Sequence, residues 1–95
     1  MAFALEAPEP WASGGWKIKI LDREWGEEPH FNFIHKRAMW RFGLRRREFM
    51  DRDPDPRDVP ADLVGFAVGR LPLLVECWDA AHPRNPVGAS EDHDE

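Results

Sequence analysis

Apolar and polar residues alternate in three short segments, and this pattern restricts the possible folds more than any other feature of the chain. The segments cover residues 16–21, 29–34 and 38–42. Successive side chains of a β-strand point to opposite faces, so a period of two indicates a strand with one buried face. Only residues 35–37 separate the second and third segments, which is typical of an antiparallel hairpin. We therefore predict a three-stranded antiparallel sheet.

One face of this predicted sheet is strongly apolar. The residues expected on it are Trp16, Ile18, Ile20, Phe31, Phe33, Trp40 and Phe42. His30 and Asn32 alternate with the phenylalanines and are expected on the opposite face, directed outward. A small sheet with one apolar face needs a cover on that face.

The second half of the chain supplies two predicted helices as the cover. The first runs from Pro60 to about Arg70, because proline is well placed in the first turn of a helix. Pro72 interrupts this segment and opens the second helix, whose apolar stripe includes Trp78 and which ends at His82. The predicted class is α+β, a three-stranded antiparallel sheet covered on one face by two C-terminal helices.

The chain has 95 residues, enough for one domain. We expect a single α+β domain at residues 16–82. Residues 1–15 lack sustained periodicity and are predicted to be a flexible N-terminal arm, and residues 83–95 a disordered acidic tail. No apolar run has the length of a membrane span, so no membrane contact is expected. The single cysteine, Cys77, suits a cytoplasmic protein.

The net charge of −5 is unevenly distributed. Residues 17–49 carry nine Lys or Arg against five acids, whereas residues 50–95 carry four against eleven. The segment 35–47 holds six Lys or Arg and no acid. We expect these cations to be solvated or to contact the acidic half of the same chain, and the alternatives are an acidic partner protein or phosphate. Trp40 and Phe42 lie in this segment but are assigned to the core, so they are not expected to stack on bases.

Residue patterns that carry catalysis are missing from the sequence. There is no threonine, and the two serines lie in the expected flexible ends, which excludes a hydrolase with a hydroxyl nucleophile. The alternating acids of residues 51–55 lack the glycine and glutamate of a calcium loop. Cys77 lies on the apolar stripe of the second helix and is expected in the core. We expect no cofactor and no bound metal.

The run Glu28-Pro29-His30-Phe31-Asn32-Phe33 resembles the Pro-Pro-His-Phe-His-Val signature of the bacterial domain-of-unknown-function family 4160. Residues 73–78 resemble the closing helix of that family. The resemblance implies a strand on each side of the signature, two final helices, and a small accessory protein of the kind discussed beside toxin–antitoxin genes. Glu28 replaces the first proline and Asn32 the second histidine, so a paired-imidazole site is not carried over.

These observations favour a noncatalytic accessory protein that acts through protein–protein contact or self-association. An alternative is a nucleic-acid-binding regulator using segment 35–47, and a third is a small metal-dependent enzyme using His30, Glu76 and His82. Trp25 lies in a polar turn and would anchor a contact if exposed. The predicted binding residues are Trp25, His30, Asn32, Lys36, Arg37, Arg41, Arg45, Arg46 and Arg47.

Overall fold

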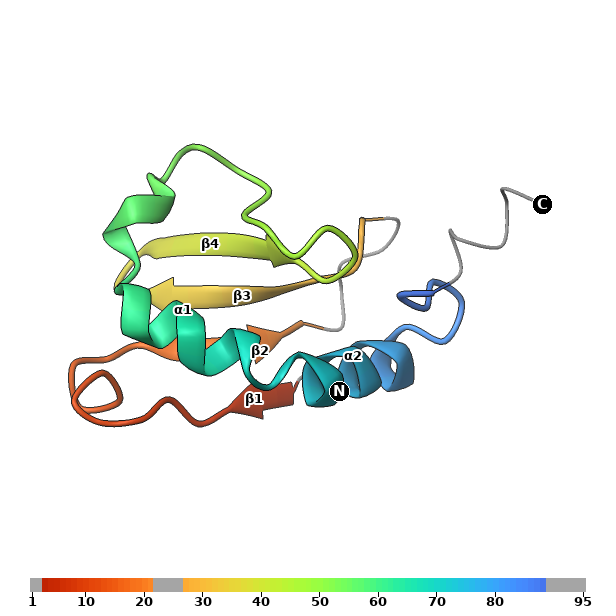
Figure 1. The fold of residues 1–95 in the computed structure, drawn as a ribbon, viewed down its shortest axis with the longest axis horizontal. Coiled ribbons are helices and arrows are strands. Elements are labelled where there is room, and N and C mark those ends of the chain that lie inside the picture. The colour runs from red at the N-terminus through yellow and green to blue at the C-terminus, as the bar shows by residue number, and fades with distance from the viewer. Residues whose placement is uncertain (1–2, 22–26, 89–95) are drawn as a thin grey trace.

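The sheet has four antiparallel strands in the order β1-β2-β3-β4, as seen in a computed structural model that describes residues 3–21 and 27–88 (Figure 1). The strands are β1 (Phe3–Leu5), β2 (Lys17–Ile20), β3 (His30–His35) and β4 (Ala38–Gly43). A 3₁₀ turn, η1 (Pro56–Asp58), precedes the helices α1 (Ala61–Val68) and α2 (Leu71–Ala81). The α+β class is therefore confirmed, together with the antiparallel sheet and the two C-terminal helices.

The prediction of three strands is wrong, because β1 adds a fourth. Phe3 pairs with Ile20 and Leu5 with Ile18, so β1 continues the sheet beyond β2. This strand lies within residues 1–15, the segment expected to be a flexible arm. A three-residue strand is too short to show alternation. Its conformation depends on pairing with β2, which comes more than ten residues later.

The predicted core face is confirmed by the strand register. Ile18 pairs with Phe33, and Phe33 pairs with Trp40 on its other side. Directly paired residues share a face of the sheet, so these side chains lie together. Phe31 pairs with Phe42, and their ring centroids lie 5.2 Å apart. All five side chains are at most 5% exposed, and they form the centre of the core.

Both helices lie on one side of the sheet (Figure 1), and α2 packs against β2 and β3. Leu63 and Ala67, four residues apart in α1, are fully buried. Leu74 and Trp78 repeat this spacing in α2 and are also fully buried, because residues four apart share a helix face. Pro72 occupies the first turn of α2, where no N–H donor is needed. No described helix is long and apolar enough to span a membrane.

Residues 83–88, which we call the strap, follow α2 and fold back onto its last turns. The Trp78 indole Nε1 donates to the Asn85 carbonyl at 2.7 Å, and the Val87 amide donates to Asp79 Oδ1 at 2.8 Å. The first part of the predicted disordered tail is therefore bonded to the helix. The rest of that prediction, residues 89–95, lies outside the described residues.

Candidate functional site

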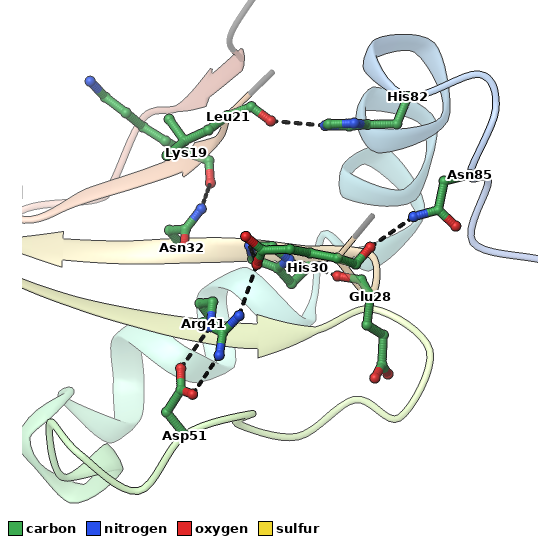
Figure 2. A network of polar contacts seen from close by, with 10 residues as sticks. Lys19, Leu21, Glu28, His30, Asn32, Arg41, Asp51, His82 and Asn85 are labelled. Atoms are coloured by element: carbon green, nitrogen blue, oxygen red, sulfur yellow. Dashed lines mark hydrogen bonds and ion pairs between the residues drawn. The ribbon is translucent and has the colours of Figure 1, made fainter. Parts of the chain in front are cut away.

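Arg41 is engaged within the molecule and does not contribute a free cation. Its Nε and Nη2 atoms donate to the two carboxylate oxygens of Asp51 at 2.8 and 2.6 Å, and Nη1 donates to Glu27 Oε1 at 2.8 Å (Figure 2). These hydrogen bonds lower the pKa of Asp51 and raise the pKa of Arg41. The guanidinium therefore joins β4 to the loop that follows it and to the residues before β3.

Arg45 is also engaged, in this case with the strap. Its Nε donates to the Val87 carbonyl at 2.7 Å, and Nη2 donates to the Pro86 carbonyl at 2.9 Å and to Asn85 Oδ1 at 3.2 Å. All three acceptors are neutral. Arg45 therefore holds a segment that lies about 40 residues further along the chain.

The remaining cations of segment 35–47 form two separate pairs. Lys36 and Arg37 form the turn between β3 and β4, and Arg46 and Arg47 follow the far end of β4 (Figure 1). All four are exposed. A strand rises about 3.3 Å per residue, so β4 separates the pairs by roughly 20 Å. The predicted basic surface is therefore not continuous.

His30 and Asn32 are fully buried, so the expectation that they face outward is wrong. The imidazole Nδ1 donates to the Glu28 carbonyl at 2.7 Å, and the ring centroid lies 5.4 Å from that of Trp78. Asn32 Nδ2 donates to the Lys19 carbonyl at 3.3 Å (Figure 2). The alternation correctly predicts that both residues lie on the sheet face opposite the phenylalanines. That face is also covered, at the end of the sheet where β3 begins.

Residues just before β3 contribute to this cover. Asn85 Nδ2 of the strap donates to the Glu27 carbonyl at 2.7 Å, while the Glu27 carboxylate accepts from Arg41. The same carboxylate lies 3.9 Å from His30 Nε2. The imidazole therefore contacts residues just before β3 and Trp78 of α2. This polar network connects β3, β4 and the strap.

The residues of the metal-enzyme alternative do not converge. His82 Nε2 donates to the Leu21 carbonyl at 2.8 Å, and its ring stacks on Trp78 at a centroid distance of 3.8 Å. Trp78 thus contacts both His30 and His82, while the Glu76 side chain is exposed. In residues 3–21 and 27–88, no three metal-ligating side chains form a cluster.

Cys77 is half-buried and packs against the core. Burial raises the pKa of its thiol, and the Glu76 carboxylate adds to this rise. A raised pKa disfavours the thiolate, which is the nucleophilic form. The structure therefore supports a packing role for this cysteine.

A shallow, open aromatic hollow of about 600 Å³, which we call the turn cleft, lies beside the β3–β4 turn. The Trp16 ring stacks on His35 at 4.3 Å with an interplanar angle of 5°, and on Trp40 at 5.3 Å. His35 Nε2 donates to the Gly14 carbonyl at 3.1 Å, which orients the imidazole against Trp16. The lining residues are Trp16, His35, Lys36, Arg37, Ala38, Trp40, Pro54 and Asp58.

The two cations of the turn cleft are available to a partner. Among the described residues, neither Lys36 nor Arg37 forms an ion pair. Lys36 also has φ = 57°, in the left-handed region that glycine and asparagine adopt most readily. Unfavourable backbone conformations of this kind concentrate at functional sites.

Sequence reasoning placed Lys36 and Arg37 in the site but missed Trp16 and His35. Trp16 was assigned to the core face of a strand, and His35 to a hairpin turn. No local pattern relates two residues 19 positions apart, so only the folded chain reveals their stacking. Trp25, the remaining predicted site residue, lies outside the described residues.

Comparison with protein-family models, curated proteins and solved structures finds no match to this chain. The resemblance to family 4160 therefore stays a prediction.

Proposed function

We propose that this protein is a noncatalytic binding module that acts through contact with a partner protein, and that the turn cleft is its contact surface. The observation that carries the proposal is the pair Lys36 and Arg37, exposed and without ion pairs among the described residues, beside the Trp16–His35 stack. Tryptophan and arginine contribute disproportionately to the binding energy of protein interfaces.

The chemistry of the cleft favours an acidic partner segment that also carries an apolar side chain. The apolar side chain would pack against the half-buried Trp16, while carboxylates would meet Lys36 and Arg37. Trp40, which is only 5% exposed, stacks on Trp16, and its indole Nε1 donates to the Asp55 carbonyl at 2.9 Å. The indole N–H of Trp40 is therefore already hydrogen-bonded and needs no acceptor from a ligand.

The distribution of cations favours a protein over a nucleic acid. Binding to a phosphate backbone grows with the number of phosphates that are neutralised. Arg41 and Arg45 make internal hydrogen bonds, and the other cations form two pairs at opposite ends of β4. The net charge of −5 also opposes binding to a polyanion.

Comparative affinity capture from cells that express the protein tests the proposal. The wild-type chain is compared with the double variant Lys36→Glu/Arg37→Glu and with a matched reversal of two exposed charges, Arg46→Glu/Arg52→Glu. We expect a specific protein partner, or a second copy of the chain, to be retained by wild type and control and lost from the first variant. Equal retention by both variants would contradict the assignment to the turn cleft.

A salt titration with labelled single-stranded DNA and RNA tests the alternative function. We expect no saturable binding of either at low salt. Binding that weakens steeply with salt, and that Lys36→Glu/Arg37→Glu abolishes, would instead identify a nucleic-acid regulator.

A further inference from the structure

A second hollow, the α2 groove, lies far from the turn cleft, between α2, the strap and the loop that follows β4. Its volume is about 570 Å³, within the range of small-molecule sites. Leu71, Val75 and Asp79 are spaced four residues apart, so one stripe of α2 forms a wall. The lining residues are Leu44, Arg45, Arg47, Leu71, Pro72, Val75, Asp79, Val87 and Gly88.

The floor of the α2 groove is apolar. Leu44 is 3% exposed and Leu71 7% exposed, and both belong to the main core. Val75 and Val87 are half-buried and pack against the same core. The surface that a ligand would cover is therefore continuous with the main core.

Two arginines at the groove supply positive charge. The three described acceptors of Arg45 are neutral and engage only Nε and Nη2, so Nη1 has no acceptor among the described residues. Arg47 is exposed, and no described carboxylate lies within ion-pair distance of it. Asp79 is the acid of the lining, and its Oδ1 already accepts from the Val87 amide.

The backbone of Arg47 gives a second, independent indication. Its φ is 59°, and among the described residues only Lys36 shares this left-handed conformation without being glycine. Each of these residues is an exposed cation that lines a hollow. Non-glycine residues in unfavourable backbone conformations are enriched at functional sites.

We infer that the α2 groove binds a small linear aliphatic carboxylate. The carboxylate would meet Arg47 and the Nη1 of Arg45, and the alkyl chain would lie along Leu71 and Val75. Arg45 is already oriented by the strap, which lowers the entropic cost of binding.

Hydrogen bonding within the strap favours an alkyl chain over a peptide. A bound peptide would need partners for its own backbone N–H and C=O groups. The Val87 amide, the Val87 carbonyl and the Pro86 carbonyl are all engaged already. An alkyl chain requires no such partners.

Titration of the ¹⁵N-labelled full-length chain with octanoate tests this inference. We expect saturable shifts of the Val75 and Gly88 amides, with a dissociation constant below about 1 mM. Arg47→Gln should weaken binding at least about tenfold, because it removes a charge-assisted hydrogen bond. Arg47→Lys should retain part of the affinity, and Arg46→Gln, at the adjacent exposed arginine outside the groove lining, should retain all of it.

Octan-1-ol and a short peptide with a free C-terminal leucine complete the experiment. Octanol should bind at least about tenfold more weakly than octanoate, because it lacks the carboxylate. Non-saturable shifts, shifts located away from the groove, or equal binding by Arg47→Gln would overturn the inference. Tighter binding of the peptide than of octanoate would overturn the choice of ligand. The circular dichroism spectrum of each variant shows whether it is folded.

Discussion

Lys36 combines an unfavourable backbone conformation with an exposed charge beside the turn cleft. The left-handed conformation costs an L-residue roughly 1–2 kcal/mol, although asparagine tolerates it better than most. A two-residue hairpin turn commonly contains glycine or asparagine for this reason. The lysine at this position therefore lowers stability, which is consistent with a role in binding.

Replacing Lys36 by asparagine should separate stability from binding. We expect Lys36→Asn to raise the free energy of unfolding by about 0.5–1 kcal/mol, because asparagine fits the positive φ better. The same variant should lose affinity for the partner, since the cation is removed. Urea denaturation measures the first effect, and comparative capture the second.

Arg37→Asn is the matched control for this prediction. It removes the neighbouring charge without relieving a positive φ. It should weaken partner capture and leave the urea midpoint unchanged. A gain in stability as large as that of Lys36→Asn would contradict the conformational explanation.

Asp51 gives a pH-dependent prediction. Hydrogen bonds from Arg41 hold its pKa below the usual value of 3.8, so the pair stabilises the fold above that pH. This contribution is lost as the pH falls through the lowered pKa. Because both side chains are about one-third exposed, the contribution should be at most about 1 kcal/mol.

Urea denaturation of wild type and Asp51→Asn at about pH 6 and about pH 3 measures this contribution. Wild type should be more stable than Asp51→Asn at the higher pH. The difference between their free energies of unfolding should be smaller at the lower pH. Asp53→Asn, an exposed acid in the same loop, should show no such trend. A difference between wild type and Asp51→Asn that does not change with pH would show that the ion pair is not its source.

At the scale of secondary-structure elements, the strap is the least expected feature. It is bonded to α2 through Trp78 and Asp79, to the residues before β3 through Glu27, and to the loop after β4 through Arg45. A polar segment rich in proline would not be held by hydrophobic burial alone. Directed hydrogen bonds to buried or half-buried groups hold it in place.

Arg45→Ala should loosen the strap. Three hydrogen bonds from a charged group disappear, and we expect a loss of about 1–3 kcal/mol in the free energy of unfolding. Hydrogen exchange should become faster at the Val87 amide. Arg46→Ala, which alters a neighbouring side chain that is 74% exposed, should change stability by less than about 0.5 kcal/mol. Unchanged protection of Val87 in Arg45→Ala would show that the strap is held by other contacts.

At the scale of the whole molecule, the fold divides the cations of segment 35–47 between internal contacts and the exposed surface. Two of its arginines stabilise the structure internally, and the other cations lie in two pairs at opposite ends of β4 (Figure 1). The turn cleft and the α2 groove each lie beside one of these pairs. Ligands at two well-separated sites bind independently unless a conformational change couples them. The two proposals can therefore be tested separately.

The sequence by itself determined the central strands, the helices and the aromatic core. Alternation along β2, β3 and β4 and the prolines that open the helices are local signals, because each depends on neighbouring residues. Within the site, the same signals correctly identified Lys36 and Arg37 as exposed residues of a hairpin turn.

Only the tertiary structure decided the pairing of β1, the burial of His30 and Asn32, and the internal roles of Arg41 and Arg45. Each of these depends on segments far apart in the chain, such as the contact between Arg45 and Val87. A periodic pattern states which residues share a face of an element. It does not state which distant group covers that face, because that is determined by the packing of the whole chain.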